Sequence, residues 1–207
     1  QGEGGIRPIT QEFLTTIKQL CDDKGILLMF DEVQCGIGRT GCFFAHQHYG
    51  LTPDVMALAK GLGGGFPIGA CLTTETVGGS MIVGTHGSTF GGNPLAMAVG
   101  NAVMDLLLEK GRLASVVEKG NYLDKELKRI QEKYNELLES VHGLGLMIGI
   151  KCRIPSGDLA LNLRKNNLLV GQSGSNMIRL LPPLNVEQTH LEKAVHILEK
   201  TLAEMNA

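Results

Sequence analysis

Apolar residues in the first thirty positions keep the spacing of one helix face and then form a continuous run. The i, i+3, i+4, i+7 spacing is kept by Phe13, Leu14, Ile17, Leu20 and Cys21. We predict that Thr10 caps this helix and that Gly25 ends it in the left-handed conformation. The apolar run 26–30 that follows is typical of a strand buried on both faces in a parallel sheet. Helix, glycine turn and buried strand together indicate an α/β fold.

Two more apolar runs, 55–59 and 68–72, predict further short strands, and the pattern then becomes helical. Asn93 offers a capping side chain and Pro94 suits the first helical position. We therefore expect a helix from there to about residue 110, followed by a more charged helix over 113–139.

The rest of the chain mixes strands with helices. The expected elements are strands with glycine bends over 141–152, a short helix over 159–165, strands over 168–170 and 177–181, and a last helix over 187–204. Asn185 and Gln188 have the spacing of a capping box for that helix. We place a domain boundary near residues 100–112, so that 1–105 and 106–207 form the two domains.

Composition excludes several classes of protein. Among 207 residues, 43% are apolar and 19% are charged, which is typical of a globular chain and too apolar for a disordered one. A net charge of −2 gives no basic surface for nucleic acid, and the apolar runs are too short to cross a membrane. The five cysteines have no regular spacing, so we expect no disulfide scaffold and a reducing, cytoplasmic setting.

Glycine is unusually frequent, with 28 residues, and it gathers in four places: 2–5, 36–41, 61–69 and 84–92. Three of these follow strand-like segments. In open α/β sheets the ligand crevice lies beyond the carboxyl ends of the strands, so polar residues there are the first candidates for chemistry. These candidates are Asp31, Glu32, Gln34, Lys60, Ser88 and Thr89.

Lys60 and Asp31 each end an apolar run. A lysine buried at a strand end has a lowered pKa and becomes a nucleophilic amine, as a Schiff base requires. A buried aspartate needs a cationic partner, such as a metal, an arginine or a protonated ring nitrogen. The alternatives are a solvated surface lysine and an aspartate that caps a helix or forms a turn.

Three other patterns have weaker support. Residues 36–41 match the dinucleotide-binding pattern G-x-G-x-x-G. However, five residues separate them from the strand and no long helix is predicted after them, and both features argue against a nucleotide-binding fold. Cys42, His46 and His48 lack a fourth metal ligand at standard spacing, so we expect no metal site. Arg179 lies in an apolar run, where it either faces solvent or binds a substrate carboxylate, with Glu3 as a candidate partner.

The ordered set of motifs resembles the class III (subgroup II) pyridoxal-phosphate aminotransferases over essentially the whole chain. The stretches that carry the resemblance are Gln1-Gly2-Glu3-Gly4-Gly5, Phe30-Asp31-Glu32-Val33-Gln34, Gly36 to Gly41, Leu58-Ala59-Lys60-Gly61, Gly63-Gly64-Gly65, Gly87 to Pro94, and Ile178 to Leu184. Within the family, the stretch 85–96 is most similar to the acetylornithine enzymes.

The resemblance implies a fold-type I transferase, with 1–105 as part of the large, mostly parallel-sheet domain and 106–207 as an α+β small domain. It also implies a role for each candidate. Lys60 would bind pyridoxal phosphate covalently and carry the proton, and Asp31 would pair with the ring nitrogen. Cofactor contacts are implied for Glu32, Val33, Gln34 and, across a subunit boundary, Thr89. Substrate contacts are implied for Ser88 and for Arg179, which Glu3 can pair with.

The implied reaction moves the δ-amino group of N-acetylornithine to 2-oxoglutarate, a step of arginine biosynthesis, in a homodimer with shared active sites. Family members run to about twice this length. We therefore expect a C-terminal half with little turnover by itself. Alternatives are an aminotransferase for ornithine, 4-aminobutyrate or succinyl-diaminopimelate, a non-catalytic remnant, or a nucleotide-binding domain built on 36–41.

Overall fold

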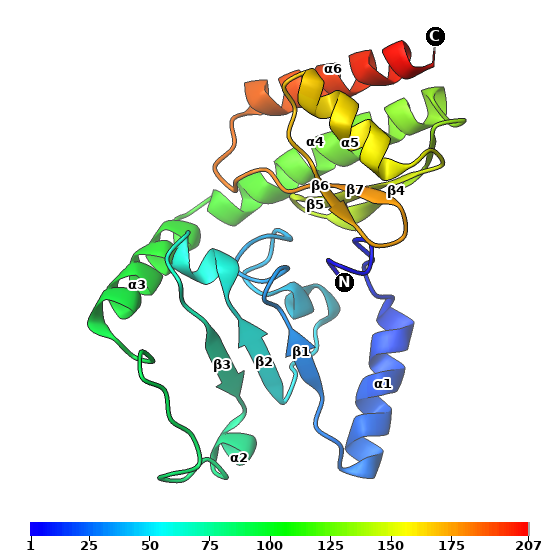
Figure 1. Ribbon diagram of the computed structural model, residues 1–207. Coiled ribbons are helices and arrows are strands. Elements are labelled where there is room, and N and C mark those ends of the chain that lie inside the picture. The colour runs from blue at the N-terminus through cyan, green and yellow to red at the C-terminus, as the bar shows by residue number, and fades with distance from the viewer. Residues whose placement is uncertain (207) are drawn as a thin grey trace. The chain divides into compact units, whose positions relative to one another are not determined.

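The computed structural model describes residues 1–206, which form two compact units (Figure 1). One unit is Ile9–Leu113, and the other joins Gln1–Pro8 to the chain from Ala114 onward. The expected division at about residue 105 placed the first eight residues with the first unit, whereas in the structure they pack with the second.

The N-terminal unit contains a three-stranded sheet. Its elements are α1 (Gln11–Lys24), β1 (Met29–Asp31), η1 (Ala45–Tyr49), β2 (Val55–Leu58), η2 (Lys60–Gly63), β3 (Ala70–Thr73), α2 (Glu75–Gly78) and α3 (Pro94–Leu108). The strand order is β1-β2-β3, with β1 parallel and β3 antiparallel to β2. Figure 1 shows α1 and β1 running in opposite directions, as the helix–turn–strand pattern predicts.

The predicted helix ends are confirmed in this unit. The hydroxyl of Thr10 accepts a hydrogen bond from the Phe13 N–H (3.3 Å), and Gly25 ends α1 with φ +63°. Asn93 caps α3 by accepting from the Ala96 N–H (2.9 Å), with Pro94 as the first helical residue. These caps form because short polar side chains satisfy N–H groups that have no partner in the first helical turn.

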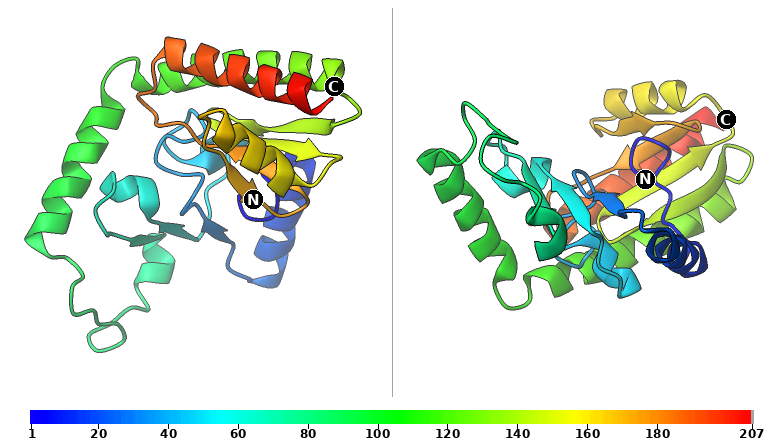
Figure 2. Two further views of the ribbon diagram at one scale, coloured as in Figure 1. Left: turned by 45° about the horizontal axis from the view of Figure 1, so that its top comes forward. Right: turned by 90° about the horizontal axis from the view of Figure 1, so that it is seen from below.

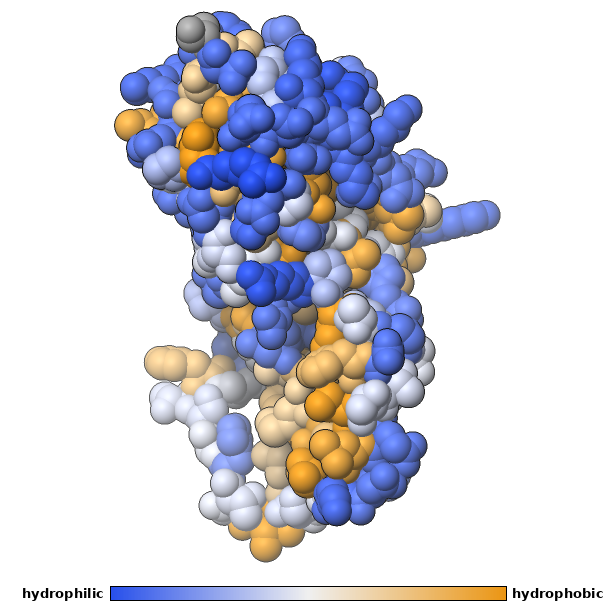
Figure 3. All heavy atoms as spheres, turned by 90° about the vertical axis from the view of Figure 1, so that its right-hand side faces the viewer, coloured by the Kyte–Doolittle hydropathy of each residue, from blue (hydrophilic) through white to orange (hydrophobic). Residues whose placement is uncertain are grey.

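The expectation that residues 26–30 form a strand buried on both faces is wrong. The strand begins only at Met29, and the side chains of Ile26, Leu27 and Met29 are more than half exposed. Within the described residues β1 is an edge strand, so only β2 lies beside it. Phe13 and Leu20 of α1 are also exposed, and Figure 3 shows apolar side chains gathered on the side of this unit that carries α1.

The C-terminal unit packs three helices against one face of a four-stranded antiparallel sheet. Its elements are α4 (Arg112–Lys133), β4 (Leu138–Leu144), β5 (Met147–Cys152), α5 (Ser156–Lys165), β6 (Gly171–Ser173), β7 (Met177–Leu180) and α6 (Gln188–Met205). The strand order is β4-β5-β7-β6. Side chains from all three helices and from β4, β5 and β7 form one buried cluster, in which Leu127, Leu163 and Ile178 are almost fully covered. Figure 2 shows the ribbons of α4 and α6 lying side by side in this unit.

Three sequence expectations differ from this unit. The charged helix ends at Lys133 rather than at 139, because Leu138 enters β4 and pairs with Cys152. The strand expected over 168–170 lies at 171–173. The expected capping box is absent, since α6 begins at Gln188 with Glu187 as its N-cap and no side-chain cap bond there.

Among residues 1–206, no helix is both long enough and apolar enough to cross a membrane. All five cysteines in the described chain are free.

Candidate active site

Asp31 and Lys60 lie at the same edge of the three-stranded sheet. β1 and β2 are parallel, and Asp31, the last residue of β1, pairs in register with Ala57. Lys60 follows three residues after Ala57, just beyond the end of β2. Because parallel strands end at the same edge, the fold brings together the two residues for which the sequence predicted chemistry.

Lys60 begins the short helical turn η2 in a strained backbone conformation. Its φ is +43°, which is uncommon for a residue with a side chain. Its side chain is exposed in this chain, which agrees with the solvated alternative that the sequence left open. Gly64 ends η2 in the left-handed conformation, as glycine does without steric cost. Strain of this kind gathers at functional sites, where the surrounding structure maintains it.

Asp31 also makes a local turn. Its Oδ1 accepts a hydrogen bond from the Val33 N–H at 3.0 Å, which is the turn-forming behaviour that the sequence left open. The side chain is exposed, and Val33 and Gln34 after it are half-buried. The turn bond fixes the direction in which the carboxylate leaves the strand, so a turn role and a ligand role are compatible.

Glu32 has a different environment from the one that its position suggested. It is only 2% exposed, and its two carboxylate oxygens accept hydrogen bonds from the N–H groups of Ala45 and His46 and from the His46 ring. This side chain is therefore bound to the start of η1, which argues against the expected contact between this carboxylate and the cofactor. No sequence spacing indicated this role, because its partners lie thirteen and fourteen residues further along the chain.

The glycine-rich stretch 36–41 forms consecutive turns and leads into a five-residue 3₁₀ helix. A dinucleotide fingerprint needs a tight strand–turn–long-helix unit, so this geometry argues against the nucleotide alternative. Within the stretch, Ile37 has φ +52° and is 2% exposed. A Cβ built on Gly61 would lie 3.4 Å from the Cβ of Ile37, so the stretch packs beneath the residue that follows Lys60.

Both histidines among the three residues considered for a metal bind groups outside that set. The Cys42 thiol lies 3.7 Å from His48 Nδ1, and His48 Nε2 lies 3.1 Å from the Thr40 carbonyl oxygen. His46 is bound to Glu32. In the part of the chain that the structure describes, no group of three or more histidine, cysteine, aspartate or glutamate side chains is arranged to hold a metal ion.

Ser88 and Thr89 lie in an exposed segment before α3. The Ser88 hydroxyl accepts a hydrogen bond from the Gly91 N–H at 2.9 Å, which makes a local turn. The structure thus places both hydroxyls on an accessible loop of the N-terminal unit.

Arg179 and Glu3 meet within the C-terminal unit, as the resemblance implied. Nη1 of Arg179 lies 2.6 Å from Oε1 of Glu3, and Arg179 is flanked in the sheet by Gly149 of β5 and Gly171 of β6. The Gly174 N–H donates to the Glu3 carbonyl oxygen at 2.9 Å and fixes the backbone of Glu3. The guanidinium side chain is mostly buried, which excludes the fully solvated alternative.

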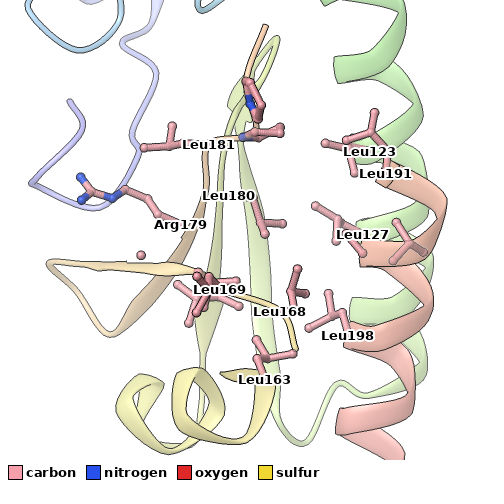
Figure 4. A pocket seen from close by; sticks show the side chains of 17 residues that line it. Leu123, Leu127, Leu163, Leu168, Leu169, Arg179, Leu180, Leu181, Leu191 and Leu198 are labelled. Carbon is pink, nitrogen blue, oxygen red and sulfur yellow. The ribbon is translucent and has the colours of Figure 1, made fainter. Parts of the chain in front are cut away.

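The same unit has an apolar cavity of about 370 Å³ (Figure 4). Leucines such as Leu127 and Leu198 line it, and Arg179 is the only charged residue among those that line it. Figure 4 shows the Arg179 side chain extending away from these leucines. The cavity therefore offers an apolar surface rather than a carboxylate site.

Comparison with known proteins identifies relatives over almost the whole chain. The family model described as Aminotransferase class-III matches residues 1–202. Acetylornithine aminotransferase of Mesorhizobium japonicum is 51% identical over 95% of this chain and 49% of its own length. Acetylornithine aminotransferase 1 of Bradyrhizobium diazoefficiens is 50% identical over the full chain and 51% of its own length. The chain thus spans about half the length of the curated relatives it matches.

Solved structures agree with the expected fold. The acetylornithine aminotransferase of Elizabethkingia anophelis has a TM-score of 0.91 at 37% identity, covering 99% of this chain and 52% of that one. An ornithine aminotransferase of Toxoplasma gondii, whose description mentions PLP at its active site, has a TM-score of 0.93 at 30% identity, covering 100% and 50%. The α/β, fold-type I prediction is confirmed.

Proposed function

Because the chain belongs to the class-III aminotransferase family, we propose that it supplies the lysine-bearing half of a pyridoxal-phosphate-dependent transamination site. The observation that carries the proposal is the placement of Lys60 and Asp31 at the ends of adjacent parallel strands. An amine and a carboxylate at one sheet edge fit the aldehyde and the ring nitrogen of this cofactor. When bound, pyridoxal phosphate supplies an electron sink for a carbanion.

The residues of the N-terminal unit would divide the work. The ε-amine of Lys60 would hold the cofactor covalently and later carry a proton to and from the reacting carbon. The carboxylate of Asp31 would keep the proton on the ring nitrogen. Val33 and Gln34, half-buried beyond Asp31, would line the ring, and we assign no cofactor contact to Glu32.

The remaining candidates would bind phosphate and substrate. The exposed loop position of Thr89 and Ser88 suits an approach to a second subunit, with Thr89 on its cofactor phosphate and Ser88 near the substrate. Arg179 would bind an α-carboxylate through its planar guanidinium. Glu3 competes for the same guanidinium, so a substrate carboxylate must displace it.

For the whole enzyme we propose that the δ-amino group of N-acetylornithine goes to 2-oxoglutarate, within arginine biosynthesis. The names of the Mesorhizobium and Bradyrhizobium relatives support this donor. We further propose a cytoplasmic homodimer, and the free state of all five described cysteines supports a reducing compartment. The chain alone would show little turnover, since it spans about half of its relatives.

Ornithine is the second candidate donor. The Glu3–Arg179 ion pair favours ornithine. A substrate with an α-carboxylate at this position can displace Glu3 and bind Arg179, whereas Glu3 keeps the pairing with Arg179 when the substrate has no carboxylate there. The Toxoplasma relative is an ornithine aminotransferase. Rates on N-acetylornithine, ornithine, 4-aminobutyrate and succinyl-diaminopimelate would separate the donors.

The test combines the chain with the N-terminal half of the Mesorhizobium relative and adds pyridoxal phosphate. We expect the bound cofactor to give an absorbance band near the visible range, which borohydride removes by reducing the bond between the cofactor and the lysine. After this reduction the cofactor should be recovered attached to the peptide that contains Lys60. Lys60→Ala should remove the band, whereas the control Lys24→Ala, at the exposed end of α1, should keep it. Failure of the combined protein to bind the cofactor would favour the non-catalytic remnant.

A further inference from the structure

Glu32 directly follows the proposed ring-nitrogen partner Asp31, but its carboxylate is buried. Oε2 accepts from the Ala45 N–H at 2.6 Å, and Oε1 accepts from the His46 N–H at 2.8 Å. Oε1 also lies 2.9 Å from Nδ1 of the His46 ring. Three donors thus converge on one carboxylate at the first turn of η1, where backbone N–H groups have no helical partners.

The histidine ring in this cluster is fixed by its neighbours. The Phe44 ring stacks on His46 with centroids 5.5 Å apart and planes 14° apart, and Phe30 of β1 lies 6.2 Å away at a tilt. Because His46 is held by two rings and a carboxylate, the start of η1 is rigidly attached to the end of β1.

The backbone of Glu32 continues the connection toward Lys60. Its N–H donates to the Ala57 carbonyl of β2 (3.0 Å), and its carbonyl accepts from the Gly36 N–H (2.9 Å). A Cβ built on Gly36 would lie 2.8 Å from that carbonyl oxygen and 3.0 Å from Oε2, so Gly36 packs directly on Glu32. Ile37 comes next, and it contacts Gly61, the neighbour of Lys60.

We propose that Glu32 is a positioning residue that sets the relative placement of Asp31 and Lys60. It acts through the chain of contacts Glu32, Gly36, Ile37 and Gly61, and it touches neither cofactor nor substrate. The strained φ values of Ile37 and Lys60 require such support, because unsupported backbone relaxes from the left-handed region. The assignment rests on the proposed function for its consequence, since Asp31 and Lys60 matter through the cofactor.

The substitution Glu32→Gln tests whether Glu32 positions Asp31 and Lys60 or only caps the start of η1. The amide keeps one oxygen but turns an NH₂ group toward N–H donors, which leaves buried polar groups unsatisfied. Glu12→Gln, on the exposed first turn of α1, is the matched control. His46→Phe is the second variant, because it keeps a ring beside Phe44 and removes only the bond from Nδ1.

The first measurement needs no cofactor and uses ¹H–¹⁵N amide spectra of the 207-residue chain. We expect Glu32→Gln to shift the amides of Ala45 and His46 and also those of Gly36, Ile37 and Gly61. His46→Phe should shift the same set by less, and Glu12→Gln should leave it unchanged. Shifts confined to Ala45 and His46 would overturn the proposal, because Glu32 would then only cap η1.

The second measurement is the dissociation constant for pyridoxal phosphate in the combined protein, at a temperature where circular dichroism shows every variant folded. We expect Glu32→Gln to weaken binding by at least about five-fold, from the cost of an unsatisfied buried group. Unchanged affinity alongside a shifted Gly61 amide would overturn the positioning role. If the unmodified protein binds no cofactor, the proposed function fails while the amide spectra still decide whether Glu32 and Gly61 are connected.

Discussion

Glu3 and Arg179 are 176 positions apart in the sequence, and their side chains meet with Oε1 and Nη1 2.6 Å apart. The ion pair is asymmetric, since the Arg179 side chain is 16% exposed and the Glu3 side chain 76%. Glu3 therefore loses little solvation in the pair and rotates away at small cost, whereas Arg179 stays in place between two glycines.

Glu3→Gln should change the free energy of unfolding by less than about 1 kcal/mol, because exposed ion pairs contribute little. The same substitution removes the carboxylate that competes for Arg179, so the affinity of the chain for 2-oxoglutarate should rise several-fold. Urea denaturation checks the first outcome. An NMR titration that follows the amides of Gly149 and Gly171, which flank residue 179 in the sheet, checks the second. Arg179→Ala is the control, and it should bind no 2-oxoglutarate at this position. Equal affinity for 2-oxoglutarate in Glu3→Gln and in the unmodified chain would show that Glu3 does not compete for Arg179.

Gly149→Ala should displace the N-terminal segment (residues 1–8) from the sheet. A Cβ at this position would lie 2.8 Å from the Cβ of Ile6 and 2.8 Å from Cε of Met177, closer than real contacts allow. Overpacking of this kind typically costs about 1–3 kcal/mol. We expect lower unfolding stability and faster hydrogen exchange at the Gly174 amide, which Glu3 holds in the native chain.

A matched glycine gives the opposite result. Gly157 lies in α5, and a Cβ there would meet only the Gln172 side chain, at an ordinary 3.7 Å. Gly157→Ala should therefore stabilise the chain by about 0.5–1 kcal/mol through helix propensity. A destabilisation by Gly149→Ala no larger than that of surface substitutions would show that Ile6 moves aside freely.

Acid should remove a stabilising contribution from Glu199 of α6. Hydrogen bonds from Arg129 and Lys133, both of α4, hold the pKa of this carboxyl down to about 2, against an ordinary value of 4.5. Because the pKa in the folded state lies below the unfolded value, the contribution is complete above about pH 4.5 and is lost as the pH falls toward 2. Its size should stay under about 1 kcal/mol, since the pair is near the surface.

Denaturation of Glu199→Gln at pH 6 and at pH 3 tests this prediction. The variant should be less stable than the unmodified chain at pH 6, and the difference should shrink at pH 3 and in high salt. Glu118→Gln, an exposed position on α4, is the control and should show no such pH-dependent difference. A stability gap for Glu199→Gln that stays constant across this range would contradict the assignment.

The cysteines should react in an order set by their surroundings. Burial, assisted by the Glu32 carboxylate, raises the pKa of the Cys35 thiol to about 11, whereas Cys71 on β3 is exposed. Since the thiolate is the reactive form, iodoacetamide at pH 8 should modify Cys71 well before Cys35. Peptide mapping against time checks the order, and in urea, where burial is lost, the two rates should converge.

Local chemistry was the part of the fold that the sequence predicted well. Thr10, Gly25 and Asn93 act on groups within a few residues, so their helix ends are independent of the rest of the chain. The end of α4 is different. Ile130, Tyr134 and Leu138 keep helical i+4 spacing, but Leu138 pairs with β5, and only tertiary structure decides between these outcomes.

The candidate site divides in the same way. Asp31 and Lys60 could be found from residue type at the end of an apolar run, because parallel strands end at one edge. The exposure of Lys60, and of Ile26 before β1, could not be found in this way. An apolar run shows that a segment is suited to burial but does not show what covers it. The bonds of Glu32 depend on a loop whose return no short-range pattern specifies.

The N-terminal segment also affects the order in which the chain can fold during synthesis. It leaves the ribosome before residues 9–206, and its partners Gly149, Gly174 and Arg179 are made long after it. The whole unit Ile9–Leu113 is translated after this segment and before its partners, because that unit is inserted in the sequence of the other unit. Domains generally fold as units during translation, so the inserted unit can fold first. The first eight residues must therefore remain unattached until the last strand of their sheet, β7, has emerged.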